Sequence, residues 1–339
     1  MPAAREGAIR SLSMPDDTQG AERGKARPAA PGTAEERAIA GDGASARPKD
    51  ALGAQPSVSA TDRGAAPPGP AIVVLSPAPE DATAVERAAA LAARLGVPLA
   101  SSIPDGGVAL CIDSRRLELR TQEDRPGRGV RSDPGWVIES LRRGGNALRG
   151  DPLARALGRG PKRIVDATAG LGGDAFHLAA LGHTVIAIER NPIVHALLED
   201  GLAAVGREAH GAALGERIEL RCGDASALLG ELREPPQVVL IDPMFPSGRA
   251  ARRGSALPPK SMQRLRLVVG DDDDAPALLL AARRAATERV VAKRGDALPP
   301  IRSAAGSGNS EGAGRTGDTG PAWSIAGTTV RYDVYRPEA

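Results

Sequence analysis

Aromatic residues are nearly absent from this chain of 339 residues, which has only two each of Phe, Trp and Tyr. None of them occurs in residues 1–70, where Ala, Gly, Pro, Ser and charged residues dominate. Such a segment buries too little apolar surface to offset the conformational entropy lost on folding. We therefore expect residues 1–70 to form a disordered tail, and similar composition predicts a disordered insertion at residues 303–320.

Cysteine is equally scarce. Cys111 and Cys222 stand far apart and form no CxxC pair, which excludes a disulfide framework and argues against a zinc site. The four His residues are scattered, so we expect no metal. A reducing cytoplasm is the compartment that this cysteine usage favours.

Long hydrophobic runs and a strong net charge are also missing. The longest apolar candidates, residues 72–75 and 277–282, fall far short of the roughly 18 residues that a membrane helix needs. The first residues contain Arg but no continuous apolar core, so we expect no secretory signal. Because the formal net charge is only +2, a nucleic-acid partner has to be argued from local charge.

The apolar pattern predicts a small α/β domain over residues 71–149. A strand is expected at residues 71–75, followed by an amphipathic helix at 82–95 whose apolar residues recur with the helical period. Two further strands are expected at 108–112 and 117–120, separated by turn-forming residues.

A second, larger domain is expected over residues 150–339, where short apolar strands alternate with helices. The expected strands are residues 163–168, 184–190, 218–222, 237–241 and 289–293. The expected helices are residues 174–181, 192–205, 225–232 and 275–286. Strands that are apolar on both faces and alternate with helices predict a parallel, doubly wound sheet. Residues 328–335 alternate in polarity and indicate an edge hairpin with a partner strand near Ser324.

The first candidate site is a glycine-rich turn between a strand and a helix. Glycines let the backbone bend tightly and approach a ligand, and the helix start supplies unpaired N–H groups. Asp174 would repel a diphosphate and favours a ligand with positive charge, such as the sulfonium and amino groups of S-adenosylmethionine. An ordinary strand-turn-helix connection is the alternative. The candidate cofactor-binding residues of this turn are Asp166, Gly170, Gly172, Gly173 and Asp174.

Acidic residues also stand at the ends of the next two strands. Glu189 lies roughly 20 residues beyond the turn, where a carboxylate accepts the ribose hydroxyls of a bound nucleoside. The alternative is a solvated Glu at a strand end. Asp224 follows the third strand and is a candidate for the adenine amine or for the N-cap of the next helix, two roles that are compatible.

The strongest catalytic signal is the segment VVLIDPMFP at the end of the fourth strand. It resembles the [DN]-P-P-[FYW] motif of enzymes that methylate exocyclic amines of bases, although Met244 replaces the second Pro. Asp242 is the candidate acceptor of the amine hydrogens, and Phe245 is the candidate surface on which the base stacks. A plain strand-to-turn exit with Phe245 in the core is the alternative.

A basic segment comes directly after this motif, since no acidic residue occurs in residues 243–270. It predicts a basic loop beside the pocket that contacts phosphates, although many such runs are only solvated. The acidic run at 271–274 is better interpreted as helix capping and solubilising charge than as a metal site. The basic residues are Arg249, Arg252, Arg253, Lys260, Arg264 and Arg266.

Taken in order, five motifs resemble the bacterial ribosomal RNA small subunit methyltransferase J family: DATAGLGGDAFHLAALG, IERNPIVHALLEDGL, VVLIDPMFP, RVVAKR and RYDVY. The resemblance runs over residues 108–335. It implies a class I, Rossmann-like methyltransferase fold, S-adenosyl-L-methionine as cofactor, and methylation of the N2 amine of a guanine in small-subunit ribosomal RNA or the 30S subunit. The cofactor-binding positions that the resemblance implies are Gly173, Asp174, Glu189, Arg190, Asp224, Ala225 and Asp242.

The residues leave two alternatives open. An Asp-Pro-x-Phe segment also suits an amine methyltransferase that acts on DNA or on a protein amide. A non-catalytic RNA-binding assembly factor could retain the same fold. A methylation assay with RNA, DNA and protein as substrates distinguishes the first alternative from an RNA methyltransferase. Cofactor binding without turnover would indicate the second alternative.

Overall fold

The computed structural model describes residues 70–113, 116–208, 211–243, 260–270, 274–302 and 320–338. The expected tail up to residue 69, nearly all of the expected insertion, and Phe245 lie outside the described residues, as do Arg249, Arg252 and Arg253. The chain divides into the units Met1–Arg63 and Gly64–Ala339, and every described residue belongs to the second. In this described part, no helix has the length and apolar character needed to cross a membrane.

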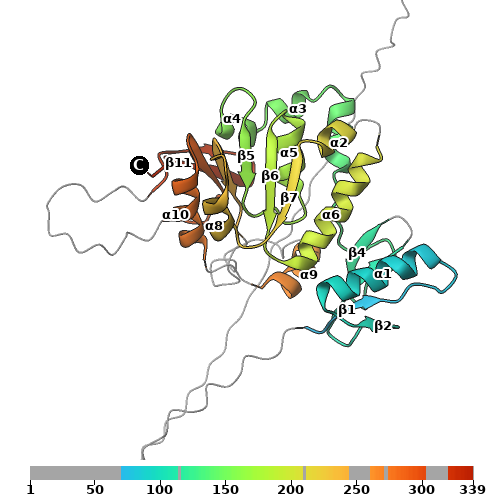
Figure 1. Cartoon of the computed structure of the whole chain (residues 1–339). Coiled ribbons are helices and arrows are strands. Elements are labelled where there is room, and N and C mark those ends of the chain that lie inside the picture. Colours follow the sequence, from blue (N-terminus) through green and yellow to red (C-terminus); the bar gives the residue numbers. More distant parts are fainter. Residues whose placement is uncertain are drawn as a thin grey trace, which may run out of the picture. The chain divides into compact units, whose positions relative to one another are not determined.

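The first sheet along the chain is small and has four strands in the order β2-β1-β3-β4 (Figure 1). Its strands are β1 (Ile72–Leu75), β2 (Leu99–Ala100), β3 (Val108–Ile112) and β4 (Leu117–Arg120). Helix α1 (Ala82–Leu95) packs on it through Ala84, Ala88 and Leu91. The helix begins where the Asp81 side chain accepts the Ala84 N–H, and it ends at Gly96 in the left-handed conformation.

The larger sheet has seven strands in the order β10-β11-β9-β8-β5-β6-β7. Its strands are β5 (Arg163–Asp166), β6 (Thr184–Glu189), β7 (Ile218–Cys222), β8 (Val238–Ile241), β9 (Arg289–Gly295), β10 (Trp323–Ala326) and β11 (Val330–Tyr335). Strands β5 to β9 are mutually parallel along this order, whereas β11 runs antiparallel to both β9 and β10. The doubly wound parallel sheet expected from the apolar pattern is therefore confirmed.

Helices and short turns connect these strands. They are α2 (Gly135–Arg142), α3 (Asn146–Arg149), α4 (Pro152–Leu157), α5 (Gly173–Ala180), α6 (Pro192–Gly206), α7 (Ala212–Gly215), α8 (Ala225–Leu228), the 3-10 turn η1 (Leu229–Glu231), α9 (Lys260–Val269) and α10 (Ala275–Ala285). Alternate strand residues face two cores, because side chains of a strand point to opposite faces. Ile164 packs with α4 and α5, whereas its neighbour Val165 packs with α8 and α10.

The C-terminal hairpin is also confirmed, since Ser324 pairs with Asp333 across β10 and β11. Strand β10 is the outermost of the two, and β11 lies between it and β9. The boundary expected near residue 149 remains a proposal. Val137 of α2 packs into the core of the large sheet, so α2 belongs with that sheet rather than with the small one.

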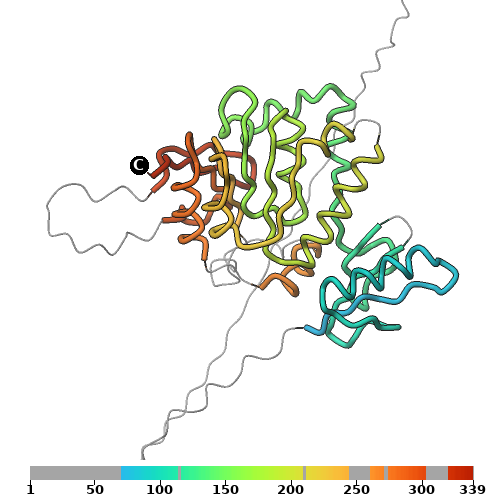
Figure 2. Tube along the Cα trace, viewed as in Figure 1, coloured from blue at the N-terminus to red at the C-terminus, as the bar shows by residue number. Residues whose placement is uncertain are grey.

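One expected loop is a helix. Residues 260–269 form α9, which buries Leu265 in a core shared by the small sheet and α6. Arg264 forms a partly buried ion pair with Asp124, in the turn after β4, so this guanidinium is not displayed for phosphate. Figure 2 shows α9, in orange, beside the small sheet in blue and teal, although the two are far apart in sequence. The basic residues of this segment predicted a loop, although its apolar residues recur at helical spacing and drive this packing.

The small sheet and α6 are further joined at Asp200, whose side chain is 8% exposed. Its carboxylate accepts the Leu117 N–H at 2.9 Å and pairs with Arg87 at 3.0 Å and with Arg116 at 3.4 Å. A buried carboxylate needs such partners, because an unpaired charge in this position would be strongly destabilising. The contact fixes the small sheet to the helix that comes after the second strand of the large sheet.

Candidate active site

The strand order reverses at β5, which has β8 on one side and β6 on the other. In open α/β sheets the crevice outside the carboxyl ends of strands at such a point is where ligands bind. A cavity of about 430 Å³ lies there. The sequence-predicted residues that line it are Gly170, Gly173, Asp174, Glu189, Arg190, Asp224, Ala225 and Asp242. Residues from four separate strand ends and turns are thus brought to one cavity.

Asp166 and Gly172 do not line this cavity, so we assign them to the structure of the turn instead. Gly172 has a φ of +84°, and a Cβ there would lie 2.4 Å from Leu198 and 2.8 Å from Phe176. Only glycine fits this left-handed and crowded position. At Gly173, by contrast, a Cβ would meet open space, so packing does not require a glycine there. The backbone at the start of α5 is therefore open to the cavity.

Asp166 lies at the end of β5 and is 1% exposed. One carboxyl oxygen accepts the Thr168 N–H at 3.2 Å, and the other finds no partner among the described residues. Burial raises the pKa of Asp166 well above its usual value, and the neighbouring charge of Asp174 adds to this. Burial therefore favours the neutral form of this carboxyl more than in an exposed Asp.

Glu189 fixes the glycine turn to the end of β6. Its Oε2 accepts the Gly170 N–H at 2.9 Å, and its Oε1 accepts the Asn191 N–H at 2.8 Å. Burial raises the pKa of Glu189, and these two backbone hydrogen bonds oppose the rise. A carboxylate has about four acceptor positions, so its backbone partners do not use all of them.

Asp224 is the N-cap of α8, as one of its two predicted roles requires. Its Oδ1 accepts the Ser226 N–H at 2.7 Å and the Ala227 N–H at 3.2 Å. The role toward adenine stays a prediction, and the side chain does line the cavity. Arg190, beside Glu189, pairs with Asp274 at 2.7 Å, and both residues also line the wall.

The opposite side of the cavity holds a chain of three charges. The Lys293 ammonium at the end of β9 lies 2.8 Å from Asp174 and 3.1 Å from Asp242. The Asp242 backbone N–H donates to the Thr168 hydroxyl at 2.6 Å, which ties the end of β8 to the glycine turn. Asp242 is thereby positioned through both its backbone and its side chain.

Burial and the lysine act in opposite directions on Asp242. Burial raises the pKa of the Asp242 carboxyl, and the Lys293 ammonium pulls it back down. For Lys293, burial disfavours the charged form, but Asp242 and Asp174 outweigh burial and raise the pKa above its usual value. Lys293 is therefore charged at neutral pH and supports the ionised form of Asp242.

Several residues of the wall were not predicted from sequence. Lys293 had one signal, because it comes directly after the apolar run Val290–Ala292 of a parallel strand. Trp136, on α2, and the apolar residues of α9 had none, because only tertiary packing brings them here. The unpredicted residues include Trp136, Thr168, Met262, Leu265, Val269, Asp274, Leu278 and Lys293. Within the described ranges, no group of three or more His, Cys, Asp or Glu side chains is arranged to hold a metal ion.

The chain matches known proteins over most of its length. A model of the SAM-dependent methyltransferase family matches residues 90–337. The protein is 41% identical to the ribosomal RNA small subunit methyltransferase J of Thioalkalivibrio sulfidiphilus, over 74% of this chain and 92% of that one. The chain belongs to the ribosomal RNA small subunit methyltransferase J family. The methyltransferase J of Pseudomonas aeruginosa is 39% identical over 76% of this chain and 93% of its own length.

A crystal structure of a SAM-dependent methyltransferase from Neisseria gonorrhoeae supports the fold of this methyltransferase. It superposes with a TM-score of 0.55 at 28% identity, over 79% of this chain and 96% of that one. The resemblance noted in the sequence motifs is confirmed, and with it the class I fold and S-adenosylmethionine as the cofactor.

The residues of the cavity fit this cofactor. Its volume of about 430 Å³ falls in the range of small-molecule sites. Glu189 offers free acceptor positions to ribose hydroxyls, and Asp174, Glu189 and Asp242 give the wall negative charge that suits a sulfonium. Bound there, S-adenosylmethionine supplies an electrophilic methyl group.

Proposed function

We propose that this protein methylates the exocyclic N2 amine of a guanine in small-subunit ribosomal RNA, in the cytoplasm. The observation that carries the proposal is Asp242, held at the end of β8 by Thr168 and Lys293, on the wall of the cofactor cavity. The names of the relatives, ribosomal RNA small subunit methyltransferase J, support the RNA substrate. We propose that the RNA substrate is presented either in the assembled 30S subunit or as naked RNA.

The residues suggest how the amine becomes a nucleophile. A base amine attacks poorly while its lone pair is delocalised into the ring. A carboxylate that accepts an N–H favours a pyramidal nitrogen, and Asp242 stands at the strand end with that acceptor. As the new N–C bond formed, the bond from the methyl carbon to the cofactor sulfur would break and release S-adenosylhomocysteine, and the amine would pass one proton to the Asp242 carboxylate. Because burial raises the pKa of Asp242, its carboxylate is a stronger base than one in water.

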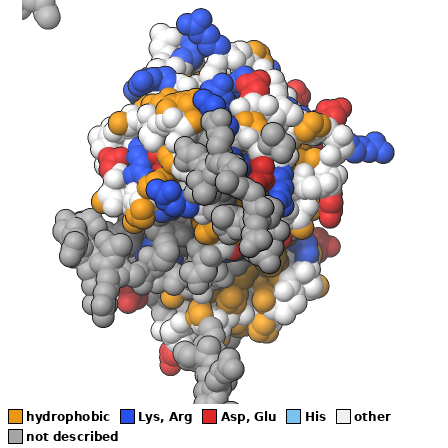
Figure 3. All heavy atoms as spheres, turned by 90° about the vertical axis from the view of Figure 1, so that its left-hand side faces the viewer, with side chains coloured by type: hydrophobic (Ala, Val, Ile, Leu, Met, Phe, Trp, Pro, Cys, Tyr) orange, Lys and Arg blue, Asp and Glu red, His pale blue; other side chains and the backbone are white. Residues whose placement is uncertain are grey.

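The protein surface agrees with local rather than global recognition of RNA. On the face shown in Figure 3, basic and acidic side chains of the described residues are interspersed with apolar ones. Among the described residues visible on this face, no field of a single sign stands out. The proposed phosphate contacts of Arg249, Arg252 and Arg253 lie outside the described residues.

Transfer of a labelled methyl group tests this function. Purified protein is incubated with labelled S-adenosylmethionine and either 30S subunits or naked small-subunit RNA, and the RNA is digested to nucleosides. We expect label in N2-methylguanosine, and far less of it with Asp242→Ala. Label in another nucleoside would reject the guanine-N2 assignment. Label in DNA or protein would favour the other amine methyltransferases, and cofactor binding without any transfer would favour an assembly factor.

A further inference from the structure

Trp136 is a large apolar side chain that remains half exposed. It is one of only two Trp residues in the chain, and its ring lines the same cavity as Asp242 and Lys293. Its exposed fraction is 50%, so one surface of the indole is open. An aromatic ring left open inside a ligand cavity is available for contact with a flat partner.

The ring is held in place from behind. The His177 ring meets it edge to face, with centroids 5.4 Å apart and planes at 81°. His177 is itself 4% exposed, and its Nε2 lies 3.4 Å from the Leu148 carbonyl oxygen. The next residue, Val137, anchors α2 in the core of the large sheet. A ring fixed in this way loses little freedom when a ligand binds.

Helix α5 connects this ring to the acceptor side of the cavity. His177 and Asp174 are three residues apart on α5 and therefore lie on one face of the helix. Asp174 contacts Lys293, which contacts Asp242. Glu189 stands at the end of β6, on the other side of β5. These contacts connect Trp136 to the Asp242 side of the cavity rather than to the proposed ribose side.

We propose that the open face of Trp136 stacks on a base of the RNA substrate that neighbours the methylated guanine. The proposal rests on the proposed function, because it takes RNA as the substrate. Single-stranded bases are commonly recognised by stacking on aromatic side chains. The stacked base is a neighbour of the target, because Lys293, Asp174 and a turn of α5 separate the ring from Asp242.

Substitution of the ring gives the first test, with methylation of small-subunit RNA as the readout. We expect Trp136→Leu to lower kcat/KM for RNA by roughly 5- to 150-fold, the range for loss of one base stack. Trp136→Phe, which keeps an aromatic face, should retain most of the activity. The cofactor Kd of Trp136→Leu, measured by calorimetry, should equal that of the parent protein.

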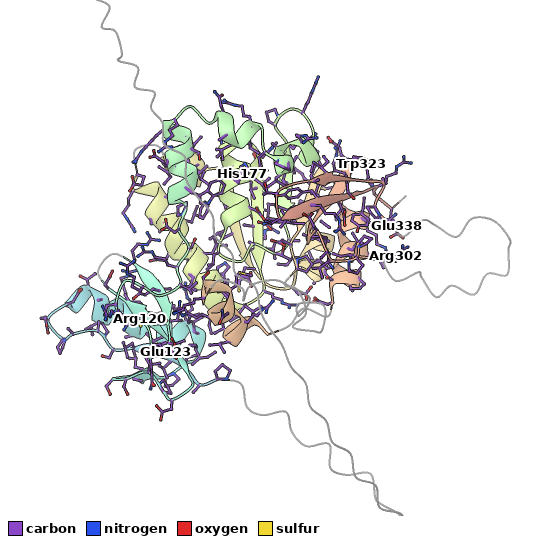
Figure 4. All side chains as sticks on the ribbon, turned by 180° about the vertical axis from the view of Figure 1, so that it is seen from behind. Arg120, Glu123, His177, Arg302, Trp323 and Glu338 are labelled. Carbon is purple, nitrogen blue, oxygen red and sulfur yellow. The ribbon has the colours of Figure 1, made fainter. Side chains whose placement is uncertain are left out.

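Trp323 supplies a matched control. It is 44% exposed, stands on β10 and is not part of the cavity wall, and Figure 4 shows it on a different element from His177 of α5. Trp323→Leu should therefore leave kcat/KM unchanged. Equal values for Trp136→Leu and the parent would overturn the proposal. A loss of cofactor affinity as large as the loss of kcat/KM would also overturn it, because the ring would then serve the cofactor.

Fluorescence gives a second test that does not need turnover. In the Trp323→Phe variant, Trp136 is the only Trp in the chain. Binding of small-subunit RNA, followed by filter retention in the same samples, should quench its emission. Retained RNA without quenching would overturn the stacking proposal. A parent protein that neither retains nor methylates this RNA would instead reject the proposed function itself.

Discussion

The two sides of the cavity hold their acidic side chains by different means. On the β6 and β7 side, Glu189 and Asp224 accept backbone N–H groups. On the β8 and β9 side, Asp174 and Asp242 share the Lys293 ammonium. Backbone donors fix the position of an acceptor without a titratable partner, whereas a lysine also sets the charge of its neighbours. The first side is suited to holding hydroxyls, and the second to a group whose protonation changes during the reaction.

The largest effect is expected at Asp242. Asp242→Ala removes the proposed amine acceptor and should lower single-turnover methylation by about 100- to 10,000-fold at saturating cofactor. Asp242→Asn keeps an acceptor oxygen but not a base, so its rate separates hydrogen bonding from proton transfer. RNA affinity should change little in both. If Asp242→Ala turned over at nearly the parent rate, the residue would only support the cofactor or the fold.

The next effect is expected on the other side, at Glu189. Glu189→Ala should weaken cofactor binding by roughly 10- to 150-fold, because charge-assisted hydrogen bonds to ribose hydroxyls are lost. Calorimetry measures this Kd, and RNA affinity serves as the internal comparison because it should not change. Thermal unfolding has to be recorded as well, since Glu189 also binds the glycine turn. Parent-like cofactor affinity would remove Glu189 from the binding site.

A pH profile tests the lysine. Lys293→Met removes the cation that lowers the pKa of Asp242, so this pKa, already raised by burial, should rise further. Fewer molecules then carry ionised Asp242 on the acid side, and the acid limb of kcat against pH should move to higher pH. We expect a loss of about tenfold near neutral pH, with recovery as the pH increases.

Lys162 is the matched control for this variant, because it forms an ion pair of 2.6 Å with Glu288 outside the cavity wall. Lys162→Met should leave the acid limb in place. An acid limb that stayed at the parent position in Lys293→Met would show that Lys293 has only a structural role.

The smallest effect is expected at Asp224. Asp224→Ala should lose about 1 kcal/mol of stability with the N-cap of α8, and Asp81→Ala should lose a similar amount at the start of α1. Only the Asp224 variant should also weaken cofactor binding if its carboxylate meets adenine. Thermal unfolding and calorimetry of the two variants provide the comparison. Equal cofactor affinity in both would restrict Asp224 to capping.

Local signals explain what could be predicted from sequence. Strand periodicity, the glycine turn and the acidic residues at strand ends placed Gly170, Glu189 and Asp242, because parallel strands bring their carboxyl ends to one edge. The crowding around Gly172, where a Cβ would meet Leu198, could not be predicted, because it depends on packing that periodicity does not show. Lys293 and Asp174 meet across 119 residues of sequence, and no local pattern encodes such a pair.

Helix α9 illustrates the same limit. Its Lys and Arg residues indicated an open basic loop, yet Leu265 packs in the core and Arg264 pairs with Asp124. The prediction of a loop rested on the basic composition of this segment, and the apolar residues at helical spacing within it were too few to indicate a helix. Trp136 likewise gave no signal, because an isolated aromatic residue reveals neither its exposure nor its neighbours.

The position of α9 also determines how the chain can be shortened. This helix lines the cofactor cavity with Met262 and Val269 while Leu265 packs in the core that includes the small sheet. A protein shortened to start at α2 would expose the apolar faces of α6 and α9 to water, and exposed patches of this kind promote aggregation. Residues 72–120 therefore cannot be deleted without loss of this packing. The small sheet that they form supports α9, which is one side of the cavity wall.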